Sequence, residues 1–537
     1  MVLHHIKGAI KQGGAILDEA QSALVDPSLD SLGDAALSAI NSAAQLAVGG
    51  TSDADSDGSA AAAPKPSSGP KPKSSAAEGG EAQGITELHQ LLHMAAHGQL
   101  NLDHIPSKPL SGEMAYNIVH GQAMLDGNAR LNLATFVSTW MDDWATRLYA
   151  ESYDKNMIDK DEYPQTAAIE ETCTKIIANL WHAPGDTIGT STIGSSEACM
   201  LAGLAMKRRW QQQRRADGLP TDKPNLVMSA AVQVVWEKFC NYWEVEARYV
   251  PVTWKDQVLT PAGMLGAIDD NTIGVVGILG QTYTGAYEPI AELAAALDDL
   301  QDRTGRDVPL HVDAASGGMV APFIQPDLVW DFQLTRVHSI NTSGHKYGLV
   351  YPGLGWVVWR SPDYLPEDLI FHVSYLGGDM PTLALNFSRP GAQVLLQYYL
   401  FLRLGRSGYT EIHKLGQVMA MRLSSAIGKM PMFELLTKGD DLPVFCWRLK
   451  PGYTTKWDLQ DLSDRLRYHG WQVPSYPMPD DISDVWVMRI VVRLGLLPGQ
   501  VELLLGDIRS SVAYLDSLDG PMPRVGRNAK KGNSFSY

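Results

Sequence analysis

The sequence contains few cysteines, and they form no motif. Among 537 residues there are four, and no two of them stand in a C-x-x-C pair. The pattern therefore offers neither a disulfide framework nor a cysteine-based metal site, and it is typical of free, mostly buried thiols in a reducing compartment. The four residues are Cys173, Cys199, Cys240 and Cys446.

Long apolar runs and an excess of positive charge are also absent. The longest candidate run, TIGVVGILG at 272–280, is too short to span a membrane and predicts a buried strand instead. No apolar signal region opens the chain, and early acidic residues such as Asp18 and Glu19 argue against an organellar transit peptide. The formal charge of −16 argues against nonspecific binding to nucleic acid. We therefore expect a cytoplasmic protein that binds neither membranes nor nucleic acids.

The first 84 residues differ in composition from the rest of the chain. Segment 52–80 is rich in Ser, Ala, Pro, Gly and Lys, a composition that cannot form a packed core and predicts a flexible linker. Before it, the Ala-rich stretch 34–48 has helical spacing. This stretch could be a helix that docks on a partner or a membrane, or a weak helix with little function, and the second interpretation is favoured. We expect residues 1–84 to form a disordered extension.

The remaining sequence predicts a folded α/β protein. With 45% hydrophobic residues, the chain can bury a large core. Short apolar runs alternate with helical patterns such as 290–305, and this alternation favours an α/β layer fold with a mostly parallel sheet. The expected strands are 225–230, 272–280, 308–315, 337–343 and 355–360.

The pattern changes again near the C-terminus. A helix expected at 455–470 and a strand at 484–495 predict a second, smaller α/β domain. The expected parts after the extension are a helical segment at 85–130, with a helix at 86–98, a large domain at 131–410, a small domain at 411–520 and a flexible tail at 521–537.

Two residues at predicted strand ends suggest a cofactor site. Asp313 follows the run VPLHV, and Lys346 lies 33 residues further on, after a second run. In open α/β sheets ligands bind at the carboxyl ends of the strands, so the two side chains can meet there. A lysine that binds an aldehyde as a Schiff base and an aspartate that pairs with a pyridine nitrogen suit pyridoxal 5′-phosphate. Taken alone, Asp313 could equally be a structural aspartate in a turn.

A glycine- and serine-rich stretch offers a place for the cofactor phosphate. In GTSTIGSSEA, Ser195 and Ser196 follow Gly194 and lead into a strong helical pattern. A helix N-terminus presents free N–H groups and a favourable dipole to an anion. An ordinary capped helix, with Glu197 in its first turn, is the alternative.

Several motifs together resemble the glutamate decarboxylases, a PLP-dependent group II decarboxylase family of fold type I. The resemblance runs from about residue 105 to the C-terminus. It is carried by LDGNARLNLATF (125–136), DKNMIDKDEYPQ (154–165), GTSTIGSSEA (189–198), HVDAASGG (311–318), SGHKYG (343–348) and NFSRPGAQ (386–393).

The resemblance implies roles for individual residues. Lys346 would bind the cofactor covalently, Asp313 would pair with its ring nitrogen, and Gln233 would lie over one ring face. Ser388 would reach the phosphate from a neighbouring subunit, and Arg489 would hold the substrate α-carboxylate. The other implied cofactor contacts are Ser195, Ser196, Thr282, Ala315, Ser343 and His345. The implied pocket for the distal carboxylate of L-glutamate consists of Thr135, Phe136, Asn156 and Asp159. An aspartate beside a carboxylate requires a proton on one of them, which favours activity in mild acid.

The resemblance also bears on partners. Relatives build each site from two chains, so at least a homodimer is implied, with segment 85–130 packing on the partner, and hexamers occur in the family. The tail carries Arg524, Arg527, Lys530 and Lys531 but no tryptophan, so we expect no calmodulin binding. Another branch of the family has a histidine in its tail that plugs the site; that position is not histidine here, and the last residue is Tyr537, so we expect no plugging by this tail.

Alternative interpretations remain for other features. His89, His93 and His97 share one helical face, but no acid or cysteine cluster accompanies them, so we expect no metal site. The protein could decarboxylate another amino acid, such as aspartate, cysteine sulfinate or an aromatic one. It could also be a silent relative that acts as a scaffold. The joint presence of Lys346, Asp313, Gln233 and Arg489 argues against the silent alternative.

Overall fold

The computed structural model describes residues 104–374, 380–453, 455–520 and 522. The expected extension, the helices at 34–48 and 86–98, the histidine stripe and residues 523–537 of the tail lie outside these residues. The described chain divides at Asn128 into two compact units. In the smaller unit, helix α4 (Gly112–Ala123) begins after Ser111, whose Oγ accepts a hydrogen bond from Met114 N at 3.2 Å.

A seven-stranded sheet forms the centre of the larger unit. Its strands follow the order β1-β7-β6-β5-β4-β2-β3. The five strands β2, β3, β4, β5 and β6 run parallel to one another, and β7 is antiparallel to both its neighbours, β1 and β6. The mostly parallel sheet expected from the sequence is therefore confirmed. The bounds are β1 (Ile188–Thr192), β2 (Asn225–Ser229), β3 (Glu246–Val250), β4 (Thr272–Ile278), β5 (Leu310–Asp313), β6 (Val337–Thr342) and β7 (Gly355–Trp359).

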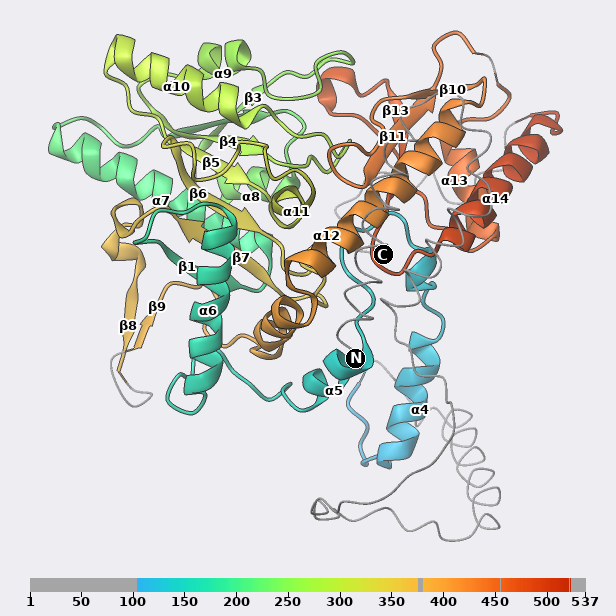
Figure 1. Cartoon of the computed structure of the whole chain (residues 1–537), viewed down its shortest axis with the longest axis horizontal. Coiled ribbons are helices and arrows are strands. Elements are labelled where there is room, and N and C mark those ends of the chain that lie inside the picture. Colours follow the sequence, from blue (N-terminus) through green and yellow to red (C-terminus); the bar gives the residue numbers. More distant parts are fainter. Residues whose placement is uncertain (1–103, 375–379, 454, 521, 523–537) are drawn as a thin grey trace, which may run out of the picture. The chain divides into compact units, whose positions relative to one another are not determined.

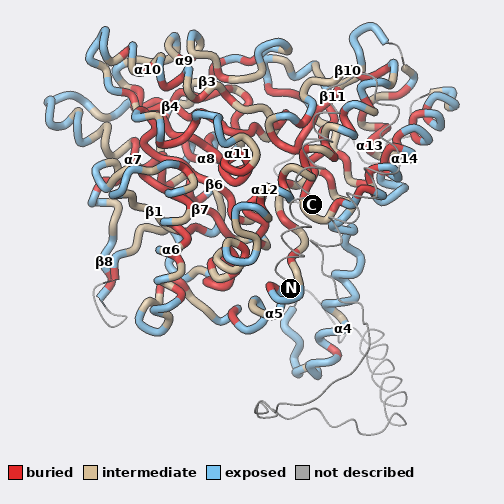
Figure 2. The backbone as a smooth tube through the Cα atoms, in the orientation of Figure 1, coloured by how far each residue is buried: buried red, intermediate tan, exposed pale blue. Residues whose placement is uncertain are grey.

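The central strands are buried on both faces. Every residue of β2, β4, β5, β6 and β7 is buried. Continuous apolar runs, in place of alternating ones, are what such strands require, because helices cover both sides of the sheet (Figures 1 and 2). The surrounding helices are α5 (Asp143–Ala150), α6 (Pro164–Leu180), α7 (Ser195–Ala216), α8 (Val234–Tyr242), α9 (Pro261–Ala267), α10 (Ile290–Thr304) and α11 (Ala321–Ile324).

Helix α10 shows how local sequence sets an element. Ile290, Leu293, Leu297 and Leu300 recur at helical spacing and are all buried. The helix ends at Gly305, whose φ of 72° is the left-handed conformation that glycine adopts without strain. The helix predicted at 290–305 is confirmed to within one residue.

A second sheet lies toward the C-terminus. Its four strands pair antiparallel in the order β10-β11-β13-β12, and they have a core of their own. Helix α12 (Ala392–Gly428) runs across the predicted domain boundary at 410 and departs from helical geometry at Gly405, where φ is 57°. The other elements are β10 (Phe433–Leu435), β11 (Val444–Leu449), α13 (Leu459–Tyr468), β12 (Ser475–Pro477), β13 (Trp486–Val491) and α14 (Pro498–Asp516), with the separate hairpin β8 (Phe371–Val373) and β9 (Met380–Thr382).

Two elements near the C-terminus are shorter than the sequence predicted. Helix α13 begins at Leu459, not at 455, because Asp458 caps it: its Oδ1 accepts from Gln460 N at 2.9 Å and from Asp461 N at 3.0 Å. Strand β13 covers Trp486–Val491, which is shorter than the expected 484–495. None of the helices in the described part of the chain is long and apolar enough to cross a membrane.

A buried ion pair joins three parts of the large sheet region. Glu170 of α6 lies 3.1 Å from Arg389, which precedes α12, and both side chains are about nine-tenths buried. Glu170 also accepts a hydrogen bond from Ser191 N of β1 at 2.9 Å. Burial alone would raise the pKa of Glu170, but Arg389 and the hydrogen bonds from Ser191 outweigh it and hold the pKa below its ordinary value.

We predict that Glu170→Gln lowers the melting midpoint by several degrees, because it leaves Arg389 buried without a counter-charge, a loss of about 3 kcal/mol. The folded-state pKa is depressed, so this stabilisation is present at pH 7 and disappears as the pH falls through that lowered pKa. Thermal melts of wild type and variant, from pH 7 down to a pH well below 4.5, the ordinary pKa of a glutamate, measure both effects. Glu502→Gln, in an exposed pair with Arg422, is the control and should change little. Equal melting midpoints for Glu170→Gln and wild type at pH 7 would contradict this assignment.

Candidate active site

The ends of two neighbouring parallel strands bring the predicted cofactor residues together. Strand β5 ends at Asp313, which pairs in register with Asn341 of β6. Lys346 follows four residues after Thr342, the last residue of β6. Both residues therefore lie at the carboxyl ends of neighbouring parallel strands, and the charge of Asp313 raises the pKa of Lys346 against the effect of burial. The predicted meeting of these residues at one sheet edge agrees with this geometry.

Lys346 lies in a desolvated environment. Its Nζ is 5.3 Å from the centroid of the Phe136 ring, and it forms no ion pair with a carboxylate among the described residues. Burial lowers the pKa of Lys346, and Arg489 lowers it further, while Asp313 and Cys199 oppose the change. A lysine with a lowered pKa carries a larger fraction of free amine, which is the form that attacks an aldehyde.

Asp313 is held by four donors. Its Oδ1 accepts from Asn341 Nδ2 and Ala315 N, both at 3.1 Å. Its Oδ2 accepts from Trp236 Nε1 at 2.9 Å and, more weakly, from Cys199 Sγ at 3.7 Å. Only 4% of the residue is exposed. The carboxylate therefore has a fixed orientation.

Sequence reasoning missed the supports behind Asp313. His311 lies 2.8 Å from Asn341 Oδ1 through Nε2 and 2.8 Å from Ser339 Oγ through Nδ1. Burial lowers the pKa of His311 to about 4, so its imidazole is neutral. The signal was present as H-x-D on β5 and S-x-N on β6, since residues two apart on a strand share one face.

The predicted phosphate cradle assembles at the start of α7. Ser195 Oγ lies 2.7 Å from Ser343 Oγ and accepts from Asn341 Nδ2 at 3.3 Å. Gly194 makes no side-chain cap, and a Cβ on it would stand 3.0 Å from the ring of His345. Ser196 is exposed at the same helix start. The free N–H groups of this turn and the serine hydroxyls suit a phosphate.

His345, another residue of the predicted cradle, is a neutral group. Its Nδ1 accepts from Leu354 N at 3.1 Å. Burial and the charge of Lys346 lower its pKa to about 4.

Glu197 does not cap the helix as the alternative interpretation supposed. Its carboxylate accepts from Ile193 N and Leu385 N, both at 2.8 Å, and so fixes the chain before Ser388.

Arg489 is a buried cation without an acidic partner. It is 7% exposed, and among the described residues no carboxylate pairs with it. Its Nη2 donates to Ala134 O at 2.6 Å, and its Nη1 donates to Thr282 O, while Nε is buried without a partner. The guanidinium lies 4.8 Å from the Phe136 ring. A buried charge of this kind is costly unless an anion neutralises it, so the site fits a carboxylate ligand.

The loop with Thr135 and Phe136 lies between these charges. Phe136 contacts both Lys346 and Arg489, and Thr135 Oγ1 accepts from Val137 N at 3.1 Å. Gln233 caps α8, with Oε1 accepting from Val235 N at 2.6 Å. Its predicted place over the cofactor ring stays a prediction, as does the contact of Thr282 with the cofactor.

Three predicted site residues form a separate group. Asn156 Nδ2 donates to Ser388 Oγ at 3.3 Å, and Asp159 Oδ1 accepts from Glu162 N at 3.0 Å. Within the described part of this single chain, no hydrogen bond or ion pair joins Asn156, Asp159 or Ser388 to Lys346. Their roles toward substrate and phosphate stay predictions.

The residues at this sheet edge fit pyridoxal 5′-phosphate. A desolvated amine, a buried carboxylate with fixed orientation and an anion cradle suit its aldehyde, its ring nitrogen and its phosphate. The backbone at Gly355 lies against the start of α7. Any side chain at this position would clash there, since its Cβ would stand only 2.6 Å from Ser195 N. Among the residues that the structure describes, no cluster of His, Cys, Asp or Glu could hold a metal ion.

Comparisons with known proteins agree with this chemistry. Residues 107–450 match the family described as the pyridoxal-dependent decarboxylase conserved domain. The chain is 50% identical to the glutamate decarboxylase of Aliivibrio fischeri, over 76% of this chain and 89% of that protein. It is 48% identical to glutamate decarboxylase beta of Listeria innocua, over 77% and 90%.

A solved structure gives the same result. The glutamate decarboxylase of Lactobacillus brevis superposes with a TM-score of 0.76 at 47% identity, covering 77% of this chain and 95% of that one. The family match covers more than half of the sequence, and the relatives are well above the identity that marks common descent. This chain therefore belongs to the pyridoxal-dependent decarboxylases of fold type I, in the glutamate decarboxylase group.

Proposed function

We propose that this protein converts L-glutamate to 4-aminobutyrate and CO2 with pyridoxal 5′-phosphate as cofactor. The observation that carries the proposal is the buried guanidinium of Arg489, which has no acidic partner among the described residues. Arg489 and the desolvated Lys346 both contact the ring of Phe136. The amine that would bind the cofactor and the guanidinium that would bind a carboxylate thus contact the same aromatic ring, that of Phe136. The relatives of 47–50% identity are named glutamate decarboxylases.

The chain supplies binding and orientation for the cofactor. When bound, pyridoxal phosphate supplies an electron sink for the charge that CO2 loss leaves on the α-carbon. Lys346 would hold its aldehyde, and Asp313 would pair with the ring nitrogen and keep a proton there. Gln233 would lie over the ring and Ala315 below it. Ser195, Ser196, Ser343 and His345 would bind the phosphate, together with Ser388 of a second copy.

Arg489 would orient the substrate. A guanidinium that donates two hydrogen bonds to the α-carboxylate fixes the direction of the bond that breaks. Lys346, with its lowered pKa, can give a proton to the α-carbon and take one up from solvent afterwards. One proton is consumed in each turnover, since a carboxylate is replaced by a C–H bond.

The distal carboxylate would be bound by the remaining predicted residues. Thr135 and Phe136 belong to the loop beside Lys346, while Asn156 and Asp159 lie in the group with Ser388. We propose that Asn156, Asp159 and Ser388 act in the site of a second copy, so the functional unit is at least a homodimer, with hexamers an open possibility in this family. Asp159 beside a carboxylate requires a shared proton, which favours mild acid.

The proposal extends to domains and location. Segment 85–130 would pack on the dimer partner, and residues 131–410 and 411–520 would form a large and a small domain. The presence of a separate sheet in each range supports this division. We propose a cytoplasmic location on the basis of four free, buried cysteines, which suit a reducing compartment.

A substrate panel tests the proposed function. The PLP-loaded protein is assayed for CO2 release from glutamate, aspartate, cysteine sulfinate and an aromatic amino acid, and the amine product is identified. We expect release from glutamate to exceed that from each of the others by at least about a hundredfold, because pocket polar groups left unpaired reject shorter or apolar side chains. Equal or faster release from another amino acid would assign a different substrate, and no release at all would favour the scaffold alternative.

The role of Lys346 predicts the outcome of Lys346→Ala. Decarboxylation should fall by at least about a thousandfold, because the covalent attachment and the proton donor are both lost. The PLP-loaded protein should also lose its visible absorbance at roughly 420 nm, because this absorbance reports the covalent attachment. Lys429→Ala, at an exposed position, should keep both activity and colour. Retained turnover in Lys346→Ala would refute the assignment.

The role of Arg489 predicts a loss of substrate binding in Arg489→Lys. An ammonium cannot bind the carboxylate with two parallel hydrogen bonds, so kcat/KM for glutamate should fall by about 30-fold or more. Steady-state kinetics at fixed pH measure the change, and Arg422→Lys, in an exposed ion pair, is the matched control. A kcat/KM within twofold of wild type would show that Arg489 does not bind substrate.

A further inference from the structure

A second arginine near the end of β13 is buried without an acidic partner. Arg493 lies four residues after Arg489 and is 9% exposed. Among the described residues no carboxylate forms an ion pair with it, and burial lowers the pKa of its guanidinium. A buried charge that binds no acid must recover its desolvation cost through other hydrogen bonds.

Four oxygens of one loop accept those hydrogen bonds. Arg493 Nη1 donates to Val137 O and to Thr139 Oγ1, both at 2.9 Å. Its Nη2 donates to Ala129 O at 3.3 Å and to Asn132 O. Both ends of the loop 129–139 are therefore bound to a single guanidinium.

The loop that Arg493 closes is part of the candidate active site. Thr135 and Phe136 lie at its middle, between the two sets of acceptors. The loop also contacts the chain at the catalytic lysine, since Ser138 N donates to His345 O at 2.7 Å and Ser138 Oγ donates to Lys346 O at 2.8 Å. The position of Thr135 and Phe136 relative to Lys346 thus depends on the shape of this loop.

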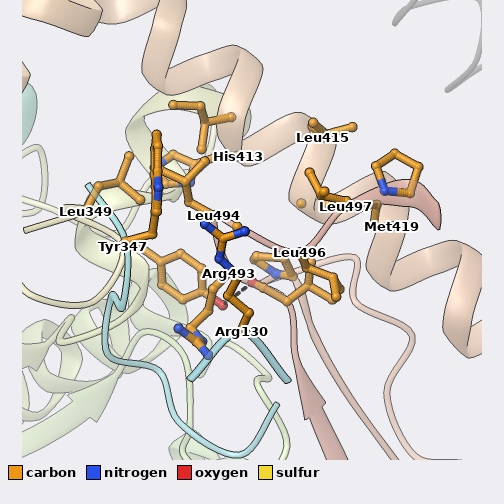
Figure 3. A pocket seen from close by; sticks show the side chains of 17 residues that line it. Arg130, Tyr347, Leu349, His413, Leu415, Met419, Arg493, Leu494, Leu496 and Leu497 are labelled. Atoms are coloured by element: carbon orange, nitrogen blue, oxygen red, sulfur yellow. Dashed lines mark hydrogen bonds between the residues drawn. The ribbon is translucent and has the colours of Figure 1, made fainter. Parts of the chain in front are cut away.

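A cavity of about 120 Å3 adjoins the loop on the side of Arg493. Arg130 of the loop and Trp140, the residue that follows it, also line this cavity. Figure 3 shows Arg493 and Arg130 among the side chains around this cavity, with Tyr347, the neighbour of Lys346. Leu133 and Phe136 anchor the loop in the two apolar cores, while the hydrogen bonds to Arg493 hold the backbone on both sides of Thr135 and Phe136.

We propose that Arg493 is a positioning residue that sets the pocket for the distal carboxylate of the substrate. It acts by holding the loop 129–139 in the conformation that presents Thr135 and Phe136. The inference rests on the proposed function, because it assumes that this loop binds the distal carboxylate. Arginine is required, since a lysine ammonium carries three donors on one atom and cannot bind four separate oxygens as the two terminal nitrogens of a guanidinium do.

The test compares binding of two unreactive acids to the PLP-loaded protein. Glutarate carries both carboxylates of glutamate, and butyrate carries one at the position that Arg489 would bind. Their dissociation constants are measured by calorimetry for wild type, Arg493→Lys and Arg493→Met. Arg493→Lys keeps the positive charge, so it still tests the proposal if the Arg493→Met variant does not fold. Arg422→Lys is the control, because Arg422 lies on α12 in an exposed ion pair with Glu502.

We expect glutarate to bind about tenfold or more weakly to Arg493→Lys, while butyrate binding changes less than threefold, a tenfold change being about 1.4 kcal/mol. In kinetics with glutamate, KM should rise by a similar factor and kcat should fall less than threefold. The absorbance of the bound cofactor should stay the same, since Arg493 contacts no cradle residue.

Three outcomes would overturn the inference: unchanged glutarate binding, equal weakening of glutarate and butyrate, or a loss confined to kcat. Failure of the proposed function is distinguishable from these. A wild-type protein that does not decarboxylate glutamate, or that binds glutarate no better than butyrate, would overturn both proposals, whereas an active wild type with an unaffected Arg493→Lys variant would overturn only the role of Arg493.

Discussion

The site depends on two charges held out of water at the ends of adjacent parallel strands. Asp313 receives four hydrogen-bond donors, and Lys346 receives none from the described residues but lies against an aromatic ring. The two environments have opposite effects. Donors fix the carboxylate in position, while desolvation leaves the amine easier to deprotonate. The chemistry that we propose for this sheet edge follows from that difference.

The sheet supplies the positions, and connections between distant segments supply the orientation. Strand register places Asn341 beside Asp313, and His311 then supports Asn341 from the same face. Arg489 and Arg493 connect the second sheet to the loop 129–139, more than 350 residues earlier in the chain. Under the proposed function, the small C-terminal sheet would shape the substrate side of a site whose cofactor side would belong to the large sheet.

Much of this could be predicted from sequence. The apolar runs at 225–230, 272–280 and 337–343 correspond closely to β2, β4 and β6, because strands buried on both faces leave a continuous apolar signal. The spacing of Asp313 and Lys346 indicated one sheet edge, and their chemistry indicated the cofactor. The resemblance supplied the individual roles, which spacing alone could not. The contacts of Arg493 left no signal, since they join a side chain to backbone oxygens whose positions only the folded chain defines. The start of α13 was placed too early because the cap at Asp458 was not recognised.

The central claim is that Lys346 holds the cofactor aldehyde while Asp313 pairs with the ring nitrogen. Borohydride reduction of the PLP-loaded protein turns the bond between the aldehyde carbon and its amine into a stable secondary amine, which peptide mass spectrometry can locate. The account predicts a single pyridoxyl-phosphate group on Lys346 and its loss when glutamate is added before reduction. A label on a different lysine, or no stable label on a protein that is nonetheless active, would contradict the account.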